Sequence, residues 1–190
     1  MKFQKEHSIF CTRNCGKKFT NEHVIASAKH LVTCHWALSM KKYNWKELNR
    51  IQKGTFGEYF AKMEFTMYGA EVYTSEIDDR GIDFVCRLPN SDFFEVQVKT
   101  VSDFNLQFVN EHKFKRKLNF LVALVRLEQF KKPEIYLFRG TDWDSDDGLL
   151  KYNAYEDKKL SPAYEIRLSK GRLKVLQNYS LENRFSELNT

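Results

Sequence analysis

The chain lacks the features that would attach it to a membrane or send it out of the cell. It contains no apolar run of about 18 residues, the length that a membrane-spanning helix requires. Its first residues, Met1 to His7, have no apolar core of the kind that defines a secretory signal. Only four cysteines are present, mostly N-terminal, and they do not resemble the disulfide framework of a secreted domain. We therefore expect a cytoplasmic protein with reduced thiols and no membrane partner.

The chain also lacks internal repeats and low-complexity linkers. Its 190 residues therefore predict one domain with a small appendage. A hydrophobic content of 42%, with 15% aromatic residues, is sufficient for a core. The net charge of +6 is consistent with a polyanionic partner.

Two short apolar segments carry polar side chains at positions that can meet in one site. Residues 94–100 predict a strand whose alternation places Glu95, Gln97 and Lys99 on the face opposite its apolar side chains. Asp83 interrupts the preceding apolar segment and adds a carboxylate. Oxygen ligands that converge with one lysine are what a divalent cation and a polarised water require for phosphodiester hydrolysis.

The connection between the two segments supports this interpretation. Residues 88–92, Leu-Pro-Asn-Ser-Asp, are a turn signal, so we expect the two strands to be antiparallel neighbours. The solvated face of an ordinary strand would also show the pattern Glu-x-Gln-x-Lys, and this alternative stays open.

A helix is predicted ahead of the two strands, from about Trp45 to Tyr68. Four large apolar residues recur at the three- and four-residue steps of a core-facing stripe, namely Phe56, Phe60, Met63 and Met67. Glu58 lies at the flank of this stripe. A glycine in a helix interior costs about 1 kcal/mol, so Gly54 and Gly57 indicate that a strand or ligand approaches that face closely. The alternative is a surface glutamate beside two incidental glycines.

The order of these elements resembles that of the PD-(D/E)xK nuclease superfamily: a helix with Glu, a strand with Asp, and a strand with an acid or Gln two residues before Lys. Gly-Ile-Asp-Phe-Val and Val-Gln-Val-Lys-Thr look most like its uncharacterised bacterial members and its homing-endonuclease branch with Gln-x-Lys. The resemblance covers roughly residues 52–138. It implies an α/β, restriction-endonuclease-like core with a mixed central sheet flanked by helices. It also implies an endonuclease that hydrolyses DNA with Mg²⁺ or Mn²⁺.

The resemblance implies a role for each polar residue. Asp83 would be the central metal ligand, Gln97 would contribute its carbonyl oxygen, and Glu58 would make an outer or second-metal contact. Lys99 would orient or deprotonate the attacking water and stabilise charge on the phosphate. Gln97 stands where most members have Asp or Glu, so Glu95 is expected to compensate for the missing charge. A nuclease fold that binds nucleic acid without cleaving it is the alternative that this departure favours.

A basic cluster follows the second strand and consists of Lys113, Lys115, Arg116 and Lys117. Such clusters bind phosphates without reading the base sequence, so we predict that this one contacts DNA. The alternative is an ordinary solvated face. Cutting both DNA strands usually calls for two active sites, and a homodimer is expected for that reason.

The N-terminal residues carry a weaker signal. Residues 1–40 are predicted to form an extension and residues 41–190 the nuclease-like domain. The extension approximates the layout of a zinc finger, with candidate Zn²⁺ ligands at Cys11, Cys15, His30 and either Cys34 or His35. A structural Zn²⁺ would explain how so short a segment folds. A helical extension with incidental thiols, a true start at Met40, and an interaction or regulatory protein with a zinc-stapled N-terminus are the alternatives.

The α/β pattern continues beyond the motif. Residues 120–125 are a continuous apolar run, which predicts a fully buried strand. Residues 134–138 follow a turn signal and are expected to pair with that strand. Residues 164–176 predict one or two further strands around Lys170 and Gly171.

Overall fold

The structure is a computed structural model that describes residues 42–74, 81–89, 91–144, 147–155 and 160–188. All of them fall within the second of the two units into which the chain divides, Lys42–Thr190. The predicted extension and its zinc ligands at Cys11, Cys15, His30 and Cys34 lie outside the described residues and stay predictions. Within the described ranges, no helix is both long and apolar enough to cross a membrane.

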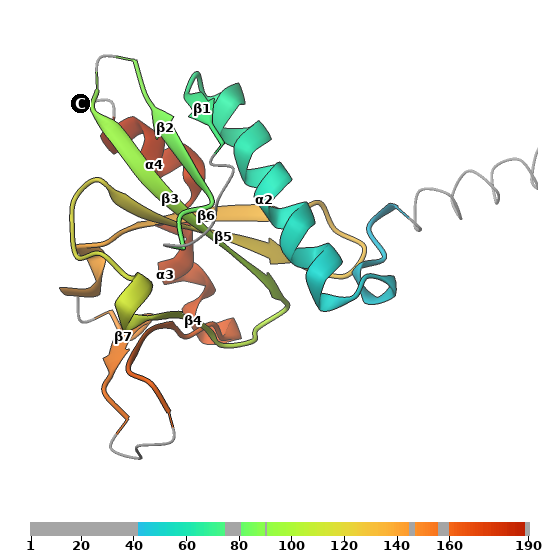
Figure 1. The fold of residues 1–190 in the computed structure, drawn as a ribbon. Helices are drawn as coiled ribbons and strands as arrows, with labels where there is room; N and C mark the ends of the chain where they lie inside the picture. Colours follow the sequence, from blue (N-terminus) through green and yellow to red (C-terminus); the bar gives the residue numbers. More distant parts are fainter. Residues whose placement is uncertain (1–41, 75–80, 90, 145–146, 156–159, 189–190) are drawn as a thin grey trace, which may run out of the picture. The chain divides into compact units, whose positions relative to one another are not determined.

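A five-stranded mixed sheet forms the centre of the fold (Figure 1). The strands lie in the order β1-β2-β3-β5-β6. Their bounds are β1 (Glu71–Tyr73), β2 (Phe84–Arg87), β3 (Phe93–Ser102), β5 (Phe120–Leu127) and β6 (Glu134–Arg139). The β3–β5 pair is parallel and the other neighbouring pairs are antiparallel. The predicted α/β class, the antiparallel β2–β3 pair and the buried strand paired with residues 134–138 are all confirmed.

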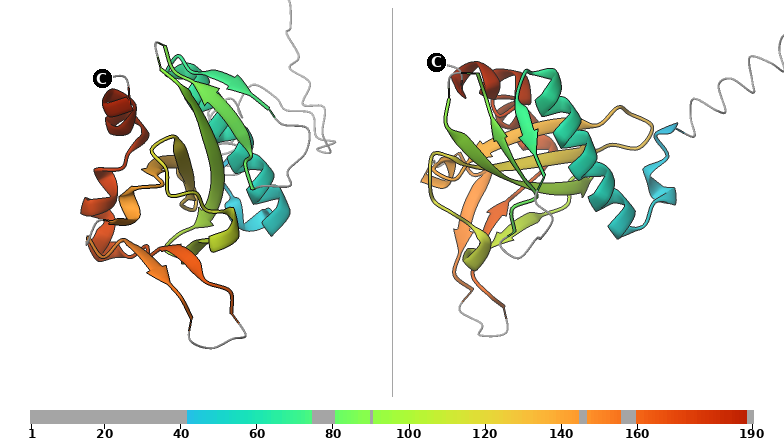
Figure 2. Two further views of the ribbon diagram at one scale, coloured as in Figure 1. Left: turned by 60° about the vertical axis from the view of Figure 1, so that its left-hand side comes forward. Right: turned by 45° about the horizontal axis from the view of Figure 1, so that its top comes forward.

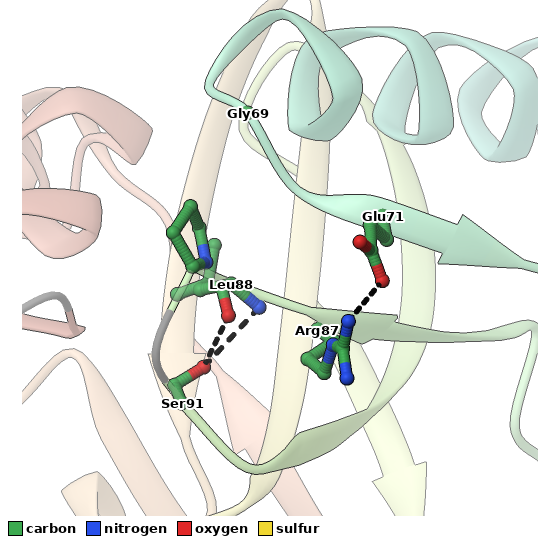
Figure 3. A pocket seen from close by; sticks show the side chains of 6 residues that line it. Gly69, Glu71, Arg87, Leu88 and Ser91 are labelled. Carbon is green, nitrogen blue, oxygen red and sulfur yellow. Dashed lines mark hydrogen bonds and ion pairs between the residues drawn. The ribbon is translucent and has the colours of Figure 1, made fainter.

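The turn between β2 and β3 is closed by a side chain (Figure 3). The Ser91 hydroxyl accepts the Leu88 N–H at 3.2 Å and donates to the Leu88 carbonyl at 3.1 Å. A serine hydroxyl that bonds nearby backbone in this way stabilises a tight turn. The turn signal at residues 88–92 therefore connects the two strands as expected.

A second, three-stranded antiparallel sheet has the order β4-β8-β7. It comprises β4 (Gln107–Asn110), β8 (Ala163–Ile166) and β7 (Leu150–Asn153).

The prediction of one or two strands in residues 164–176 is correct only for the part that belongs to β8. After β8 the chain forms the 3₁₀ turn η5 (Lys170–Arg172) and the short helix α3 (Leu173–Gln177). Leu173 and Leu176, three residues apart, both pack into the adjoining core, which explains why a helical turn forms here.

The helix predicted from Trp45 to Tyr68 is observed as α2 (Arg50–Met67). It begins later than predicted because Asn49 caps it. The Asn49 side chain accepts the Gln52 N–H, and the Gln52 side chain accepts the Asn49 N–H, both at 2.9 Å. Residues Trp45–Glu47 form the separate 3₁₀ turn η2.

The prediction for the buried face of α2 was wrong for Met63 and Met67, which are 58% and 81% exposed. Phe60 is buried as expected, and Phe56 is half-buried. The face that packs on the sheet consists of Gly57, Phe60, Ala61 and Phe65. It is rotated by about one residue, or ~100°, from the predicted stripe. The rotation brings the small residues Gly57 and Ala61 to the interface, where the helix backbone can approach the strands.

Gly57 and Gly54 differ in their surroundings, and this difference predicts opposite effects of substitution. A Cβ at Gly57 would lie 1.9 Å from Thr100 Oγ1 on β3, whereas a Cβ at Gly54 would meet nothing within 4 Å. We expect Gly57→Ala to lower the free energy of unfolding by about 1–3 kcal/mol through overpacking. We expect Gly54→Ala to raise it by about 0.5–1 kcal/mol through helix propensity. Chemical denaturation measures both changes, and equal effects of the two variants would contradict the close approach at Gly57.

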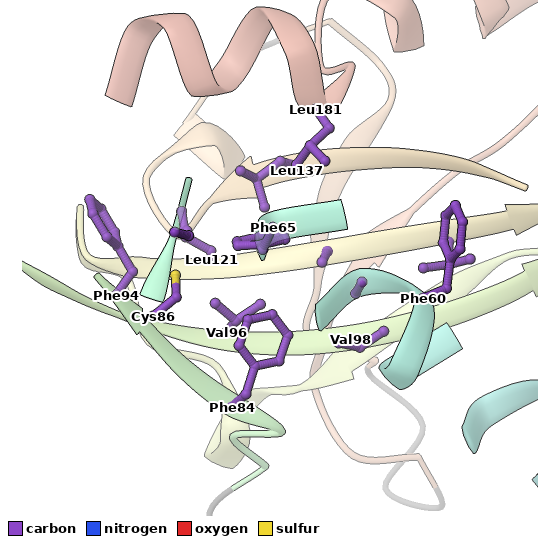
Figure 4. Packing of buried hydrophobic residues seen from close by; sticks show 14 of the residues in the cluster. Phe60, Phe65, Phe84, Cys86, Phe94, Val96, Val98, Leu121, Leu137 and Leu181 are labelled. Carbon is purple, nitrogen blue, oxygen red and sulfur yellow. The ribbon is translucent and has the colours of Figure 1, made fainter. Parts of the chain in front are cut away.

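The two faces of the central sheet pack against different layers, and the second layer packs against β5 and β6 (Figure 2). On one face, α2 and the C-terminal helix α4 (Leu181–Leu188) enclose a core that includes Phe65, Phe84 and Leu181 (Figure 4). The Phe65 ring meets the rings of Phe84 and Phe185 edge-on, at centroid distances of 5.2 and 5.0 Å. On the other face, side chains of β5 and β6 pack with the second sheet and α3.

Candidate active site

Strand β3 divides its side chains between two faces, as alternation predicts. The apolar residues Phe94, Val96 and Val98 belong to the core under α2. The polar residues Glu95, Gln97 and Lys99 lie on the opposite face, in register with Phe120, Val122 and Leu124 of β5. Gln97 is only 4% exposed, while Glu95 and Lys99 are half-buried. The expected common face of the three polar residues is therefore confirmed.

The sequence pattern predicted that Asp83 lies within the first strand. In the structure it lies immediately before that strand, β2. Its N–H donates to the Val96 carbonyl at 2.9 Å, and its Oδ2 accepts the Val98 N–H at 2.5 Å. Since the β2–β3 ladder ends at Val96, the carboxylate replaces the backbone acceptor that a continued strand would have supplied. Val98 lies between Gln97 and Lys99 in the chain, so this hydrogen bond holds the Asp83 carboxylate beside both residues.

The side-chain carbonyl oxygen of Gln97 is buried and has no hydrogen-bond partner among the described residues. Leaving a buried acceptor unpaired costs about 1–3 kcal/mol, so folded proteins normally supply a partner. The oxygen is also the ligand type that Mg²⁺ prefers. The orphaned carbonyl therefore fits a bound cation or an ordered water.

Gly81 lies between Lys113 of the basic cluster and Gln97 of the site. Its φ of +71° favours glycine, and a Cβ there would lie 2.8 Å from Lys113 Cδ and 3.0 Å from Gln97 Nε2. The Lys113 side chain thus packs over Gly81, next to Gln97. The sequence interpretation did not assign Gly81 a role, although a glycine two residues before the candidate ligand Asp83 is a signal that could have suggested one.

The buried side chain of Phe114 fixes the chain between Lys113 and Lys115. It is buried in the second core, where its ring stacks on Tyr164 at a centroid distance of 3.7 Å and meets Trp143 edge-on at 4.9 Å. The preceding Lys113 therefore reaches the site. The following Lys115 ion-pairs with Glu95 on β3, at 2.6 Å between Nζ and Oε2. Arg116 and Lys117 complete the cluster and are exposed.

The Glu95–Lys115 pair bears on two of the predictions. Both side chains are about 30% exposed, so the pair is partly screened by solvent and holds the two charges together only weakly. Glu95 is thus close to Gln97 along β3, but its carboxylate is engaged by Lys115. Whether Glu95 compensates for the neutral Gln97, and whether Lys115 contacts phosphate, both stay predictions.

Glu58 is placed differently from the other candidate residues. It lies on α2, which covers the opposite face of β3 from Glu95, Gln97 and Lys99. It is half-buried and makes no hydrogen bond or ion pair within the described part of the chain. Its neighbour Gly57 touches Thr100, beyond the end of the β2–β3 ladder. Thr100 follows Lys99 on β3, so Glu58 on α2 lies near the part of β3 that carries Lys99, although on the other face of the strand.

The donor set suits Mg²⁺ better than a softer metal. Among the described residues, no three His, Cys, Asp or Glu side chains form a group that could hold an ion. Cys86 lies in the core, where burial raises the pKa of its thiol to about 12, so it is not a thiolate ligand. Mg²⁺ is commonly held by one or two carboxylates together with waters and substrate phosphates. The Asp83 carboxylate and the Gln97 carbonyl fit that pattern.

A separate pocket lies at the far end of β2 and is lined by Gly69, Glu71, Arg87, Leu88, Pro89 and Ser91 (Figure 3). Its cation, Arg87, is already paired with Glu71 at 2.9 Å. Its hydroxyl, on Ser91, bonds the backbone of the turn. The polar groups of this pocket are therefore engaged with one another, and the Asp83 region is the stronger candidate for an active site.

Comparisons with known proteins add a likeness of fold. No family model matches the chain, and no curated protein matches it either. Among solved structures, the Holliday junction resolvase Hjc of Archaeoglobus fulgidus, an archaeal hyperthermophile, has 11% sequence identity and a TM-score of 0.46. The match covers 70% of this chain and 96% of that chain. Values this low assign neither a family nor a function.

Proposed function

We propose that the protein is a metal-dependent nuclease that hydrolyses phosphodiester bonds in DNA. The observation that carries the proposal is the arrangement of Asp83, Gln97 and Lys99. The Asp83 carboxylate is held at the Val98 N–H, and the Gln97 carbonyl oxygen is buried with no partner in the described part of the chain. Lys99 follows Gln97 on the same face of β3. An anion-binding lysine next to two oxygen donors suits phosphodiester hydrolysis better than simple stabilisation of the fold.

Asp83 and Gln97 would hold Mg²⁺ or Mn²⁺, which supplies Lewis acidity toward a phosphate oxygen and a more acidic water when bound. Lys99 orients or deprotonates the attacking water and stabilises the negative charge that develops on the phosphate. Glu58 contributes an outer contact from the α2 side. The burial of Gln97 and the core packing of β3 keep these groups in fixed positions before the substrate arrives.

The basic cluster supplies the sequence-independent contact with DNA in this proposal. Lys113 lies against Gly81 beside the site, and Arg116 and Lys117 are exposed on the same loop. Cations at these positions can neutralise backbone phosphates on either side of the bond to be cut.

The test is the cleavage of plasmid, linear duplex, single-stranded and branched DNA by purified protein, with Mg²⁺, with Mn²⁺ and with EDTA. We expect cleavage that requires the metal and stops when it is chelated. The second candidate function is DNA binding without cleavage, which the neutral Gln97 and the small number of acidic ligands favour. Metal-independent DNA binding with no cleavage of any DNA form would establish that second function instead.

Gln97→Glu is expected to retain activity and to lower the Mg²⁺ concentration for half-maximal cleavage by about tenfold. The added charge strengthens the attraction to a dication at short range, and the substitution preserves the size of the side chain. Titration of the cleavage rate with Mg²⁺ measures the change, and Gln97→Ala serves as a control that should need more Mg²⁺ than the wild type. Complete loss of activity in Gln97→Glu would mean that the amide NH₂ makes an essential contact and that the ligand assignment is wrong.

A further inference from the structure

Over β1, β2 and the beginning of β3, the sheet face that is turned away from α2 carries side chains that lie outside both core clusters of the described residues. The register places Glu71, Arg87 and Phe93 in one row across these strands, and Tyr73, Val85 and Glu95 in the next. Tyr73 and Phe93 are 48% and 50% exposed. In the part of the chain that the structure describes, none of these side chains belongs to either core cluster.

The exposed side chains on this face are held in an ordered group, which we call the aromatic platform: Tyr73, Arg87 and Phe93. The Tyr73 and Phe93 ring centroids are 5.8 Å apart, and the Arg87 guanidinium lies 5.7 Å from the Phe93 centroid. Glu71 holds the group together, because its Oε2 accepts the Tyr73 hydroxyl at 2.8 Å and pairs with Arg87 at 2.9 Å. The platform is therefore preorganised, although it is open to solvent.

The aromatic platform continues directly into the candidate active site. Phe93, Glu95, Gln97 and Lys99 share one face of β3, and the rise of a strand places Phe93 about 13 Å from Gln97. The Glu95–Lys115 pair lies between them, and Lys113 borders the site. Arg87 and Lys115 are each paired with a carboxylate, of Glu71 and Glu95, so the exposed rings carry the contact on this face. Exposed aromatic rings beside a site bordered by a lysine are a combination that binds single-stranded nucleic acid, with bases on the rings and phosphates on the cation.

We propose that the aromatic platform stacks an unpaired base of the DNA strand that runs past Asp83, Gln97 and Lys99, at a short distance along the strand from the phosphodiester bond that is cut. The inference rests on the proposed function, since the DNA backbone must run past Asp83, Gln97 and Lys99. The bases of an intact duplex are stacked on each other and offer no free face to Phe93. The protein therefore prefers single-stranded, flapped or branched DNA over a fully paired duplex.

The test measures binding by fluorescence anisotropy, with a labelled single-stranded oligonucleotide and a blunt duplex of the same sequence. EDTA is present so that cleavage plays no part, and the salt concentration is fixed. We expect Phe93→Ala to weaken single-strand binding by about tenfold, within the range for the loss of one base–aromatic contact, and to leave duplex binding unchanged. Phe93→Tyr should restore single-strand binding because it keeps the ring.

Phe108→Ala is the matched control. Phe108 is also a strand phenylalanine and is 50% exposed, but it lies on β4 in the second sheet, away from the platform. It should bind both DNA forms as the wild type does. Thermal melting of all three variants separates a binding defect from misfolding.

The outcomes distinguish the two proposals. Metal-dependent cleavage together with unchanged single-strand binding by Phe93→Ala would overturn the platform and leave the nuclease standing. Selective loss of single-strand binding in a protein that cuts no DNA would support the platform and remove the nuclease activity. A dimer that Phe93→Ala converts into a monomer, as seen by sedimentation, would assign this face to a second copy of the chain and overturn the inference.

Discussion

Asp83→Asn is expected to reduce metal-dependent DNA cleavage by about a thousandfold while the protein stays folded. Removal of the carboxylate charge deprives the cation of its principal ligand, and a loss of ~4 kcal/mol of transition-state stabilisation corresponds to that factor. The amide oxygen of the variant still accepts the Val98 N–H, so the end of the β2–β3 ladder is retained. Single-turnover cleavage rates at saturating Mg²⁺, together with chemical denaturation, measure the two quantities separately.

Two variants control for this result. Asp83→Ala removes both the charge and the acceptor, so it should also lower the free energy of unfolding by about 1–3 kcal/mol. Asp92→Asn makes the same change at an exposed position in the turn between β2 and β3 and should cleave as the wild type does. Unaltered cleavage by Asp83→Asn would remove this site from consideration.

Lys99→Ala is expected to reduce the cleavage rate by about 100- to 1000-fold, the usual effect of removing one group that stabilises developing charge. Lys99 lies two residues after Gln97 on the same face of β3 and is half-buried, beside the proposed metal ligands. Lys99→Arg should not restore the rate, because a guanidinium neither takes up a proton at neutral pH nor fits the same space. DNA binding in EDTA should weaken only slightly, since one phosphate contact is lost among several.

Lys132→Ala removes an equal charge from an exposed position in the turn between β5 and β6 and serves as the control. Its cleavage rate should match that of the wild type. If Lys99→Ala lost as much DNA affinity as cleavage rate, Lys99 would bind the substrate in its ground state and would have no separate part in the chemistry.

The phase of α2 shows where sequence periodicity was insufficient. Phe56, Phe60, Met63 and Met67 satisfy the helical spacing as well as the observed face does, because both sets repeat at three- and four-residue steps. Hydrophobicity alone favoured the face with Met63 and Met67 over the face with the smaller residues Gly57 and Ala61. The observed face was decided by the fit of a small residue, Gly57, against Thr100, a contact between positions 43 residues apart in the chain.

The sequence by itself determined that Glu95, Gln97 and Lys99 share a face, because alternation along a strand follows from the backbone geometry of each residue. It also determined the β2–β3 hairpin, because the turn residues that close it are local. Only the tertiary structure decided that the Asp83 carboxylate caps the Val98 N–H and that the buried Gln97 carbonyl finds no hydrogen-bond partner among the described residues. The first depends on where β2 ends beside β3, and the second depends on which side chains from distant segments surround Gln97. The spacing of residues along a single segment predicts neither the end of a neighbouring strand nor the contacts between distant segments.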